Sequence, residues 1–359
     1  MSSHKTINLV VFGIGNVGST FINQVKAAKK RLKEHSNLDI QIPIIANSKL
    51  VFFNPEGIEC TWESNFEISS TKYKISEIIL SIKRKQLENV IVIDATASKD
   101  LVNHYNAFVE HGFHIVSANK LGNTLDFNFY KALRDNLKLH NKSFLYETNV
   151  GAGLPVIETV KNLYDSGENI NRIRGVFSGS LSYVFNTFSS EDESFSKVLK
   201  KASHLGLTEP DAREDLSGKD VARKLLILAR ELDLDVELNN VKIESLVPKV
   251  LNGKTTKAQF YERISELDNP FQNRKKELQN HQVLRYVGEL DVAKKQLEVK
   301  LIAEDRQTPL GQLKGSDSIF EIYTDSYNDR PLVIQGAGAG KEVTARGLFS
   351  DIIKIANTI

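Results

Sequence analysis

The sequence predicts an α/β protein in which a parallel-sheet domain precedes an α+β domain, and three observations support this prediction. Short apolar runs alternate with amphipathic stretches up to residue 149, as in βαβ units. A glycine-rich turn directly follows the first apolar run. From residue 150, helical stretches come first and alternating, strand-like stretches later. We therefore expect a first domain over residues 1–149 with 336–359 and a second over residues 150–335.

The composition limits the class of protein. The chain has 359 residues, 41% of them hydrophobic, and 47 basic against 45 acidic residues give a net charge of +2. This length fits two domains, and the near-neutral charge argues against binding to nucleic acid or to a membrane surface. Cys60 is the single cysteine, which excludes a disulfide framework and a cysteine-rich metal site. No apolar run approaches the ~20 residues of a membrane span. The chain starts directly with a strand-like run, so we expect no signal peptide and a cytoplasmic protein.

The first domain is predicted from buried strands, rich in β-branched residues, with helices between them. The runs INLVVF and NVIVIDA have the continuous apolar character of strands covered on both faces. In chain order we expect strand Ile7–Phe12, helix Val17–Leu32, strand Ile40–Ala46, helix Ile75–Lys85, strand Asn89–Ala95, helix Leu101–His111, strand His114–Ser117, helix Phe127–Leu139 and strand Phe144–Glu147. Their alternation predicts a parallel sheet.

The second domain begins where NVGAGLP, with two glycines and a proline, interrupts this pattern near Val150. We expect helix Pro155–Asp165, strand Ile170–Ser178, helices Leu181–Thr187, Ser194–Leu205 and Gly218–Leu232, and strands Leu284–Leu290, Gln296–Ile302, Ile319–Thr324 and Leu332–Gln335. The later strands alternate between apolar and polar residues, as antiparallel strands do. A final helix, Lys341–Ala356, is expected to return to the first domain, because GAGAG before it resembles a turn that faces a cofactor.

The turn after the first strand matches G-x-G-x-x-G and indicates a Rossmann dinucleotide-binding domain. In this motif the first glycine permits the tight turn, the second lets a pyrophosphate approach the backbone, and the third lets helix and strand pack closely. The following helix offers free N–H groups and a partial positive charge to the phosphates. The alternative is a glycine-rich turn without a ligand. The expected cofactor contacts here are Gly13, Ile14, Gly15, Asn16, Val17 and Gly18.

The end of the second strand bears on the choice of cofactor. NAD sites usually carry Asp or Glu there, which binds the ribose 2′-hydroxyl. This chain has Asn47, Ser48 and Lys49 instead, so no carboxylate repels a 2′-phosphate. The residues favour NADP(H), with NAD possible. The alternative is that Lys49 is a solvated loop lysine.

Acidic and basic residues are dense between Gly206 and Lys224. Ser217 and Asp220 have the spacing of a capping box at the start of a helix. Asp220 and Lys224 are four residues apart and share one face of that helix. A buried lysine beside an aspartate suits proton transfer, whereas an exposed pair of this spacing is an ordinary ion pair.

Further candidates follow strands of the first domain, where ligands of open α/β sheets bind. They are Lys120 in the segment Ser117–Lys120 and Thr96 in the segment Asp94–Ser98, with helix caps and loop residues as the alternative. The sequence contains neither H-E-x-x-H nor G-x-S-x-G, so a zinc peptidase or a serine hydrolase is unsupported.

Several motifs occur in one order along the chain and together resemble homoserine dehydrogenase. They are GIGNVG, ANSK, ATAS, ANK, YETNVGAGLPVI, FSGSLSYVFN, LGLTEPDAREDLSGKDVARKLLILAR and IQGAGAG. The resemblance covers Ile7–Ala356, and the LTEPD…DLSGKDVARK block is its most specific part. It is similar to the dehydrogenase half of bifunctional aspartokinase–homoserine dehydrogenases, and at this length we expect a monofunctional chain.

The resemblance implies a reaction and a place in metabolism. The reaction is the reversible NAD(P)H-dependent reduction of L-aspartate 4-semialdehyde to L-homoserine. It leads to threonine, methionine and isoleucine. The resemblance also implies a homodimer formed by the sheet of the second domain, for which the strands between Leu284 and Gln335 are available.

The resemblance also implies roles for single residues. Lys224 corresponds to the lysine that donates a proton to the forming alkoxide, with Asp220 beside it, and Lys120 to a second lysine that contacts cofactor and substrate. The implied substrate contacts are Glu209, Asp215, Asp220, Gly179 and Ser180. The further implied cofactor contacts are Gly206, Glu209 and Gly340. A monovalent cation, usually sodium, is implied at Glu147, Val150, Ala152 and Leu154.

The chain departs from the family pattern at some positions, and two other functions are possible alternatives. Leu207 stands where many members have tyrosine, and Leu121 replaces a lysine after Lys120. Aspartate-semialdehyde dehydrogenase needs a cysteine nucleophile, and Cys60 has no partner histidine in its segment. An NADP(H)-binding redox sensor without turnover would keep the glycine loop but need no paired lysine and aspartate.

Overall fold

The chain forms two structural units. The computed structural model describes residues 4–59, 61–253 and 255–359. Residues 1–153 and 340–359 form the first unit, and residues 154–339 form the second. The boundaries expected from the sequence lie four residues before each of these junctions. Cys60, discussed above as a nucleophile, lies outside the described residues.

The first unit is built on a seven-stranded sheet in the part of the chain that the structure describes, in the order β4-β3-β2-β1-β5-β6-β7. The strands are β1 (Lys5–Phe12), β2 (Leu38–Ala46), β3 (Leu50–Phe53), β4 (Thr71–Lys72), β5 (Val90–Asp94), β6 (His114–Ser117) and β7 (Phe144–Leu145). The five strands from β2 to β7 run parallel, whereas β3 and β4 are antiparallel to their neighbours. The expectation of a wholly parallel sheet was therefore wrong at this edge. Asn47–Lys49 form a short turn into β3, and only antiparallel strands can be joined so briefly.

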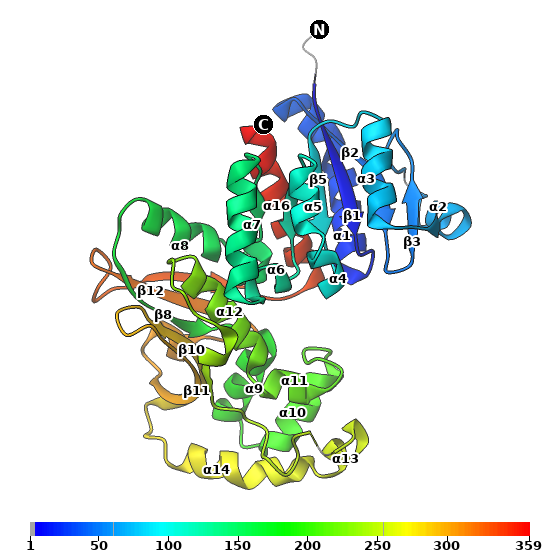
Figure 1. Ribbon diagram of the computed structural model, residues 1–359. Helices are drawn as coiled ribbons and strands as arrows, with labels where there is room; N and C mark the ends of the chain where they lie inside the picture. The colour runs from blue at the N-terminus through cyan, green and yellow to red at the C-terminus, as the bar shows by residue number, and fades with distance from the viewer. Residues whose placement is uncertain (1–3, 60, 254) are drawn as a thin grey trace. The chain divides into compact units, whose positions relative to one another are not determined.

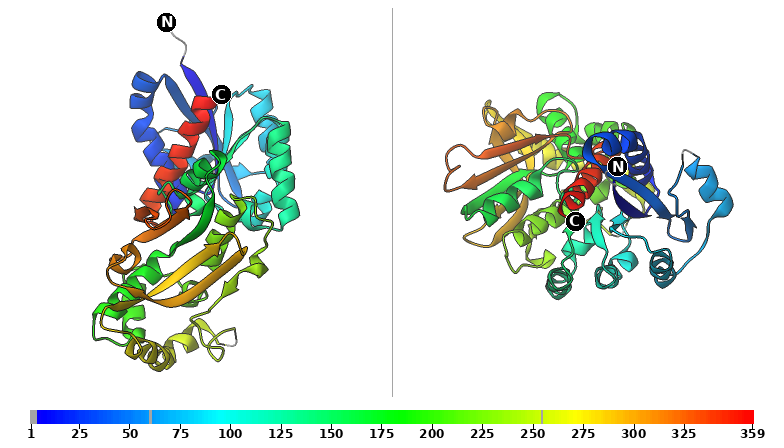
Figure 2. Two further views of the ribbon diagram at one scale, coloured as in Figure 1. Left: turned by 90° about the vertical axis from the view of Figure 1, so that its left-hand side faces the viewer. Right: turned by 90° about the horizontal axis from the view of Figure 1, so that it is seen from above.

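Helices cover both faces of this sheet (Figure 1). They are α1 (Asn16–Ser36), α2 (Trp62–Ser69), α3 (Ile75–Arg84), α4 (Lys99–Val102), α5 (Tyr105–Glu110), α6 (Leu121–Thr124), α7 (Phe127–Leu139) and α16 (Lys341–Thr358), with the 3-10 turn η1 at Glu147–Asn149. Helices α1 and α16 lie side by side on one face, and α3, α5 and α7 lie on the other, as the right-hand view of Figure 2 shows. The unit therefore has three layers, and the carboxyl ends of its parallel strands are free to hold a ligand.

Two expected elements of the first unit differ in detail. The helix expected over Leu101–His111 is divided into α4 and α5, because His104 N bonds to the carbonyl of Leu101 and tightens the turn between them. The strand expected to reach Glu147 ends at Leu145, and Glu147 belongs to η1.

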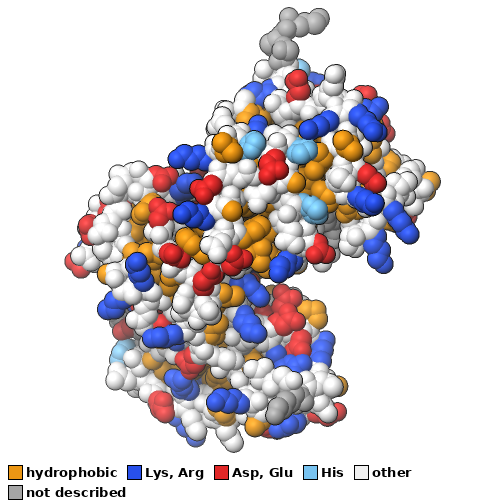
Figure 3. Space-filling view, viewed as in Figure 1, with side chains coloured by type: hydrophobic (Ala, Val, Ile, Leu, Met, Phe, Trp, Pro, Cys, Tyr) orange, Lys and Arg blue, Asp and Glu red, His pale blue; other side chains and the backbone are white. Residues whose placement is uncertain are grey.

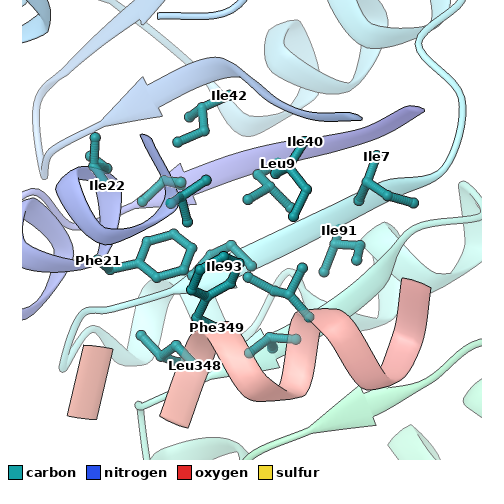
Figure 4. Packing of buried hydrophobic residues seen from close by; sticks show 14 of the residues in the cluster. Ile7, Leu9, Phe21, Ile22, Ile40, Ile42, Ile91, Ile93, Leu348 and Phe349 are labelled. Carbon is teal, nitrogen blue, oxygen red and sulfur yellow. The ribbon is translucent and has the colours of Figure 1, made fainter. Parts of the chain in front are cut away.

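The hydrophobic core of the first unit packs helix α1, near the start of the chain, against helix α16 at its end (Figure 4). Phe21 of α1 meets Phe349 of α16 edge to face, with ring centroids 6.4 Å apart. Isoleucines of β1, β2 and β5 complete the cluster. Lys5 Nζ donates to the carbonyl oxygen of Ala356 at 3.0 Å. A fully buried phenylalanine contributes about 1.5–3 kcal/mol, so α16 is an integral part of this unit, as the sequence predicted.

The second unit has a six-stranded sheet in the described residues, in the order β13-β12-β8-β10-β11-β9. Its strands are β8 (Ile170–Val176), β9 (Lys242–Ile243), β10 (Gln282–Asp291), β11 (Gln296–Asp305), β12 (Ser318–Thr324) and β13 (Leu332–Gly336). All neighbours are antiparallel except β9 and β11. Its helices are α8 (Val156–Asp165), α9 (Gly179–Ser190), α10 (Phe195–His204), α11 (Ala212–Leu216), α12 (Lys219–Arg230), α13 (Lys257–Glu262), α14 (Asp268–Lys276) and α15 (Pro309–Gln312), with 3-10 turns η2 (Leu238–Asn240) and η3 (Ile264–Leu267).

Helices α9 and α12 pack on one face of this second sheet, against β10. Behind them Phe177 and Phe320 meet edge to face, with centroids 4.9 Å apart. The other face carries a buried ion cluster, in which Arg174 pairs with Glu321 at 2.6 Å and Glu304 at 3.1 Å. The second unit is thus an α+β unit, as expected from the sequence.

Basic and acidic side chains are interspersed over the face shown in Figure 3. Among the described residues, no helix combines the length and the apolar character needed to cross a membrane.

Candidate active site

The glycine loop of the first unit has the geometry that its motif predicts. Gly13 has φ +93°, and a Cβ there would lie 2.6 Å from the carbonyl oxygen of Ala95. A Cβ at Gly18 would overlap the carbonyl of Gly13, whereas a Cβ at Gly15 would meet nothing within 4 Å among the described atoms. Gly13 and Gly18 are thus required by the fold itself, and Gly15 leaves open space in front of helix α1. No acidic residue occupies the first turn of α1, so its N-terminus is available to a phosphate.

A cavity of about 1040 Å³ in the first unit brings together candidate cofactor residues that are far apart in the sequence. Gly13, Ser48, Lys49 and Thr96 line it with Asn47. Asn47 Oδ1 accepts hydrogen bonds from the backbone N–H groups of Lys49 and Leu50, both at 2.8 Å. This oxygen is therefore committed to the turn. Ser48 and Lys49 are exposed at the cavity rim.

A buried hydrogen-bond network below this cavity holds Thr96 and the segment of Lys120. Asp94 accepts hydrogen bonds from Thr96 Oγ1 at 2.6 Å, Tyr105 OH at 2.7 Å and Asn119 Nδ2 at 3.0 Å. Burial raises the pKa of Asp94, and these hydrogen bonds oppose the rise. Tyr105 OH also lies 2.9 Å from Ser117 Oγ. The network connects the ends of β5 and β6, so it fixes both candidate segments to each other.

Lys120 follows β6 directly and is half-buried. Its backbone carbonyl accepts from Asn123 N at 3.0 Å and from Thr124 Oγ1 at 3.1 Å. The segment that contains Lys120 is therefore held from both sides, by the Asp94 network and by the first turn of α6.

Lys224 and Asp220 form the ion pair that their spacing predicts, and Lys224 is buried. Lys224 Nζ lies 2.9 Å from Asp220 Oδ2 and donates to the carbonyl oxygen of Phe177 at 2.8 Å. Lys224 is 9% exposed, whereas the side chain of Asp220 is 46% exposed, so the pair is buried at its lysine end only. An ammonium has three N–H donors, and the third finds no acceptor among the described residues. Lys224 therefore keeps one N–H for a ligand, although the neighbouring cavity is lined by its partner Asp220 and not by Lys224 itself.

Asp215 is held beside this pair by the α9 loop. Ser180 Oγ donates to Asp215 Oδ1 at 2.6 Å, and Glu209 N donates to Asp215 Oδ2 at 2.9 Å. Burial raises the pKa of Asp215, and the charge of Asp220 adds to the rise against these two hydrogen bonds. Ser178 caps α9 by accepting from Leu181 N at 3.3 Å.

A cavity of about 430 Å³ in the second unit is lined by Glu209, Asp215 and Asp220. It is also lined by residues that the sequence did not single out, among them Ser178, Arg213 and Asn252. A signal for Ser178 was available, since it precedes helix α9 with the chemistry of an N-cap. Asn252 gave no such signal, because only the tertiary fold brings its loop to the cavity.

Two of the expected glycine contacts lie on turns, and the third, Gly179, is the first residue of helix α9. Gly206 (φ +69°) follows α10 and has open space around it, and Gly340 (φ +120°) precedes α16. Gly179 lies where a Cβ would be 2.9 Å from the carbonyl of Ser316. These positions require glycine for the backbone itself.

The expected capping box of Ser217 and Asp220 does not form. Helix α12 begins after Gly218, which has φ +70°, and no side chain caps it. Ser217 instead ends α11 and donates to the carbonyl of Glu214 at 2.7 Å. The reason is that Gly218, in the left-handed conformation, occupies the N-cap position of α12, and glycine has no side chain with which to cap it.

The residues of the expected cation site are divided between the units. Glu147, Val150 and Ala152 belong to the first unit and Leu154 begins the second. Glu147 is buried, and its N–H donates to Asp351 Oδ2 at 2.9 Å. In the described residues no group of three His, Cys, Asp or Glu side chains is arranged to hold a metal ion. Any cation here would depend largely on carbonyl oxygens, with Glu147 as the one carboxylate of the expected set.

Family models match both units. A model described as homoserine dehydrogenase matches residues 155–353, and one described as the homoserine dehydrogenase NAD-binding domain matches residues 13–147. The chain belongs to the homoserine dehydrogenase family. The resemblance drawn from the motifs is thereby confirmed, and the family is one of NAD(P)-dependent oxidoreductases.

Individual relatives in the homoserine dehydrogenase family agree. The homoserine dehydrogenase of Saccharomyces cerevisiae is 37% identical over 99% of this chain and 100% of the yeast protein. The bifunctional aspartokinase/homoserine dehydrogenase of Buchnera aphidicola is 40% identical over 98% of this chain. That match covers 43% of the Buchnera protein, so the chain spans less than half the length of this bifunctional relative.

Solved structures show the same fold. A protein of unknown function from Candida auris has a TM-score of 0.90 at 36% identity, over 99% of both chains. A hyperthermophilic archaeal homoserine dehydrogenase in complex with NADPH has a TM-score of 0.73 at 20% identity, over 99% of this chain and 98% of that one. The predicted fold class, a Rossmann domain with an α+β catalytic domain, is therefore confirmed.

Proposed function

We propose that the chain catalyses the reversible NAD(P)H-dependent reduction of L-aspartate 4-semialdehyde to L-homoserine, in the biosynthesis of threonine, methionine and isoleucine. The observation that carries the proposal is the buried Lys224, paired with Asp220 and held by the carbonyl of Phe177 beside a cavity lined by carboxylates. The carboxylates that line this cavity, among the basic residues Arg213, Lys219 and Arg223, suit the ammonium group of the substrate. A redox sensor without turnover has no use for a buried, oriented proton donor.

The chain's own groups divide the chemistry. The bound nicotinamide supplies or accepts the hydride. Lys224 donates a proton to the substrate oxygen during reduction and takes it back during oxidation, while Asp220 and the Phe177 carbonyl keep the ammonium aimed. Asp215 keeps lone pairs free for the substrate ammonium after accepting from Ser180 and the Glu209 backbone. Lys120 is proposed to contact cofactor and substrate.

The test is NADP⁺ reduction at 340 nm with L-homoserine at alkaline pH. Lys224→Met keeps the length of the buried side chain, and we expect a loss of turnover of about 10²–10⁴-fold with unchanged NADPH binding. Lys197→Met, on an exposed position of α10, is the matched control and should keep wild-type turnover. Absence of homoserine-dependent reduction in the wild type, or full activity of Lys224→Met, would contradict the proposal.

We also propose that NADP(H) is preferred. Asn47 Oδ1 is committed to its turn, so Ser48 and Lys49 at the cavity rim are left to bind the 2′-phosphate. Lys49→Glu should raise the KM for NADP⁺ at least about tenfold, because a charge-assisted hydrogen bond is lost and a repulsion gained. Its KM for NAD⁺ should change little. Equal changes for both cofactors would contradict this assignment.

Two further proposals concern assembly and cations. The chain is proposed to form a homodimer through its second unit, whose edge strand β13 leaves Val333 40% exposed. Light scattering after gel filtration measures the molar mass, and the mass of a monomer would contradict this proposal.

A structural Na⁺ is proposed at the carbonyls of Val150 and Ala152 with the carboxylate of Glu147, since a hard monovalent cation suits oxygen donors. Thermal stability in sodium against choline chloride tests it, and an unchanged Tm would contradict it.

A further inference from the structure

A cavity of about 620 Å³ in the second unit, separate from the acidic one, is lined by cations and neutral residues. Arg285 of β10 lies at it, with Arg306 and Lys314 from the segment that follows β11. Half of its other lining residues come from α9, Asn186 and Ser189 among them. No acidic side chain of the described residues lines it. None of the residues assigned above to substrate, cofactor or cation belongs to it.

Arg285 is an unusual buried cation. It is 3% exposed, and its guanidinium donates only to backbone carbonyls: Leu284 at 2.8 Å, Leu310 at 2.9 Å, and Gly311 and Leu313 at 2.7 and 3.2 Å. Within the described residues no carboxylate lies at ion-pair distance. Buried charges are normally paired with an opposite charge. The site therefore carries a positive charge that the protein itself leaves uncompensated.

Neighbouring charges add to this imbalance. Burial lowers the pKa of Arg285 to about 10, and the positive charge of Arg306 contributes to the drop. Glu304 acts in the opposite direction, but its carboxylate is already paired with Arg174 at 3.1 Å and accepts from Thr308 Oγ1 at 2.8 Å. Neither Arg306 nor Lys314 forms an ion pair with a described residue. An anion in the cavity would relieve the repulsion between Arg285 and Arg306.

The cavity is also held in shape without a ligand. Three of the carbonyls bound by Arg285, those of Leu310, Gly311 and Leu313, fix α15 and the residue after it. Asn186 Nδ2 donates to the carbonyl of Gly315 at 2.9 Å and so fixes the backbone next to Lys314. The N–H of Arg306 donates to the carbonyl of His281 at 2.8 Å. Binding would therefore cost little ordering of the backbone.

From this geometry we infer a second ligand site, in which Arg306 and Lys314 contact a dianionic phosphoryl group and the buried charge of Arg285, whose N–H groups are mostly held by carbonyls, adds electrostatic attraction. The guanidinium fork of Arg306 matches the tetrahedral oxygens of phosphate, and Lys314 adds a point charge. The volume accommodates either inorganic phosphate or a small phosphomonoester. The site lies within the second unit and is independent of the dinucleotide loop.

The experiment is isothermal titration of the full chain with inorganic phosphate at constant ionic strength, in saturating NADPH so that the glycine loop is occupied. The double variant Arg306→Gln/Lys314→Gln changes exposed rim residues and leaves Arg285, which the loop needs, in place. We expect phosphate affinity to fall at least about tenfold, because two charge-assisted contacts are lost. The matched control Arg330→Gln/Lys276→Gln removes the same charges at exposed positions elsewhere in the unit and should bind as wild type.

A second titration with glycerol 3-phosphate separates the sources of the phosphoryl group. Tighter binding of the ester supports an organic phosphate as ligand, and equal binding supports the free ion. The Lys49→Gln variant should bind phosphate as wild type does. Absence of saturable binding, equal affinity in the double variant, or loss of binding in Lys49→Gln would overturn the inference.

Discussion

Removal of one buried hydroxyl tests the network that connects the ends of β5 and β6. In Tyr105→Phe the ring stays in place, and Asp94 loses the donor at 2.7 Å while it keeps those from Thr96 and Asn119. A hydrogen bond to a charged group contributes about 1.5–3 kcal/mol. Ser117 Oγ still accepts a hydrogen bond from Asn119 N at 2.9 Å, so the variant does not leave this hydroxyl without a partner and no second hydrogen-bond energy is added to the loss.

We therefore expect Tyr105→Phe to lower the free energy of unfolding of the first unit by about 2–3 kcal/mol. This equals a factor of about 30–150 in the unfolding equilibrium and about 4–12 °C in Tm for a unit of this size. The single tryptophan, Trp62, is buried in the same unit, so its fluorescence during urea unfolding reports the right transition.

The loss should also depend on pH in a particular direction. Burial already raises the pKa of Asp94, and removal of the Tyr105 donor raises it further. A carboxyl whose folded pKa is raised loses stability as pH rises through that pKa. The deficit of Tyr105→Phe should therefore be larger at pH 7 than at pH 4. Tyr327→Phe removes an exposed hydroxyl that bonds to no described residue, and serves as the control.

A change within about 0.5 kcal/mol of wild type at pH 7 would refute this reasoning. So would a deficit that is the same at both pH values, because a loss of packing alone has no such pH dependence. The Tyr327→Phe control must meanwhile remain at the wild-type value.

Three further predictions concern the glycine loop, a buried histidine and the ion pair. Gly18→Ala should unfold at a clearly lower urea concentration, because its Cβ would overlap the Gly13 carbonyl. Gly15→Ala should keep wild-type stability and lose NADPH affinity, because a Cβ there meets no described atom. Equal behaviour of the two variants in urea unfolding and in fluorescence titration with NADPH would contradict the loop assignment. His114 has a pKa lowered to about 4 by burial and by Lys142, so the folded state binds fewer protons than the unfolded state between pH 6.5 and 4. Wild-type stability relative to His114→Gln should accordingly fall by up to about 3 kcal/mol as pH falls through this range, and a constant difference in urea midpoints would argue against it. Asp220→Asn should lower kcat by about 10–100-fold with a smaller change in the KM for homoserine, because Lys224 keeps its bond to the Phe177 carbonyl but loses its charged partner. A change in KM alone would show that Asp220 binds the substrate and does not position Lys224.

The sequence was most informative where a pattern follows directly from local chemistry. The glycine motif and the i,i+4 pair of Asp220 and Lys224 are local, and the structure reproduces both arrangements. The return of the final helix to the first unit was inferred from the GAGAG turn, and α16 indeed packs against α1. Family motifs then carried the assignment of the whole chain.

The sequence was least informative where tertiary neighbours decide. Strand β3 was missed because its run LVFF follows only three turn residues, and it pairs with β2 as an added antiparallel strand. The capping box failed because Gly218 adopts a left-handed conformation, which the spacing of Ser217 and Asp220 does not reveal. The carbonyl of Phe177 that holds Lys224 carries no side-chain signature at all.

The placement of α16 has a consequence for biosynthesis. The first unit is interrupted by residues 154–339 and is completed only by residues 340–359. During synthesis on the ribosome, Phe21 and its apolar neighbours therefore lack their packing partner Phe349 until the whole intervening unit has been synthesised. During that interval the nascent chain exposes an unfinished apolar face, which is a natural binding site for chaperones. The first unit should thus become able to bind its cofactor only late in synthesis, once residues 340–359 have been added.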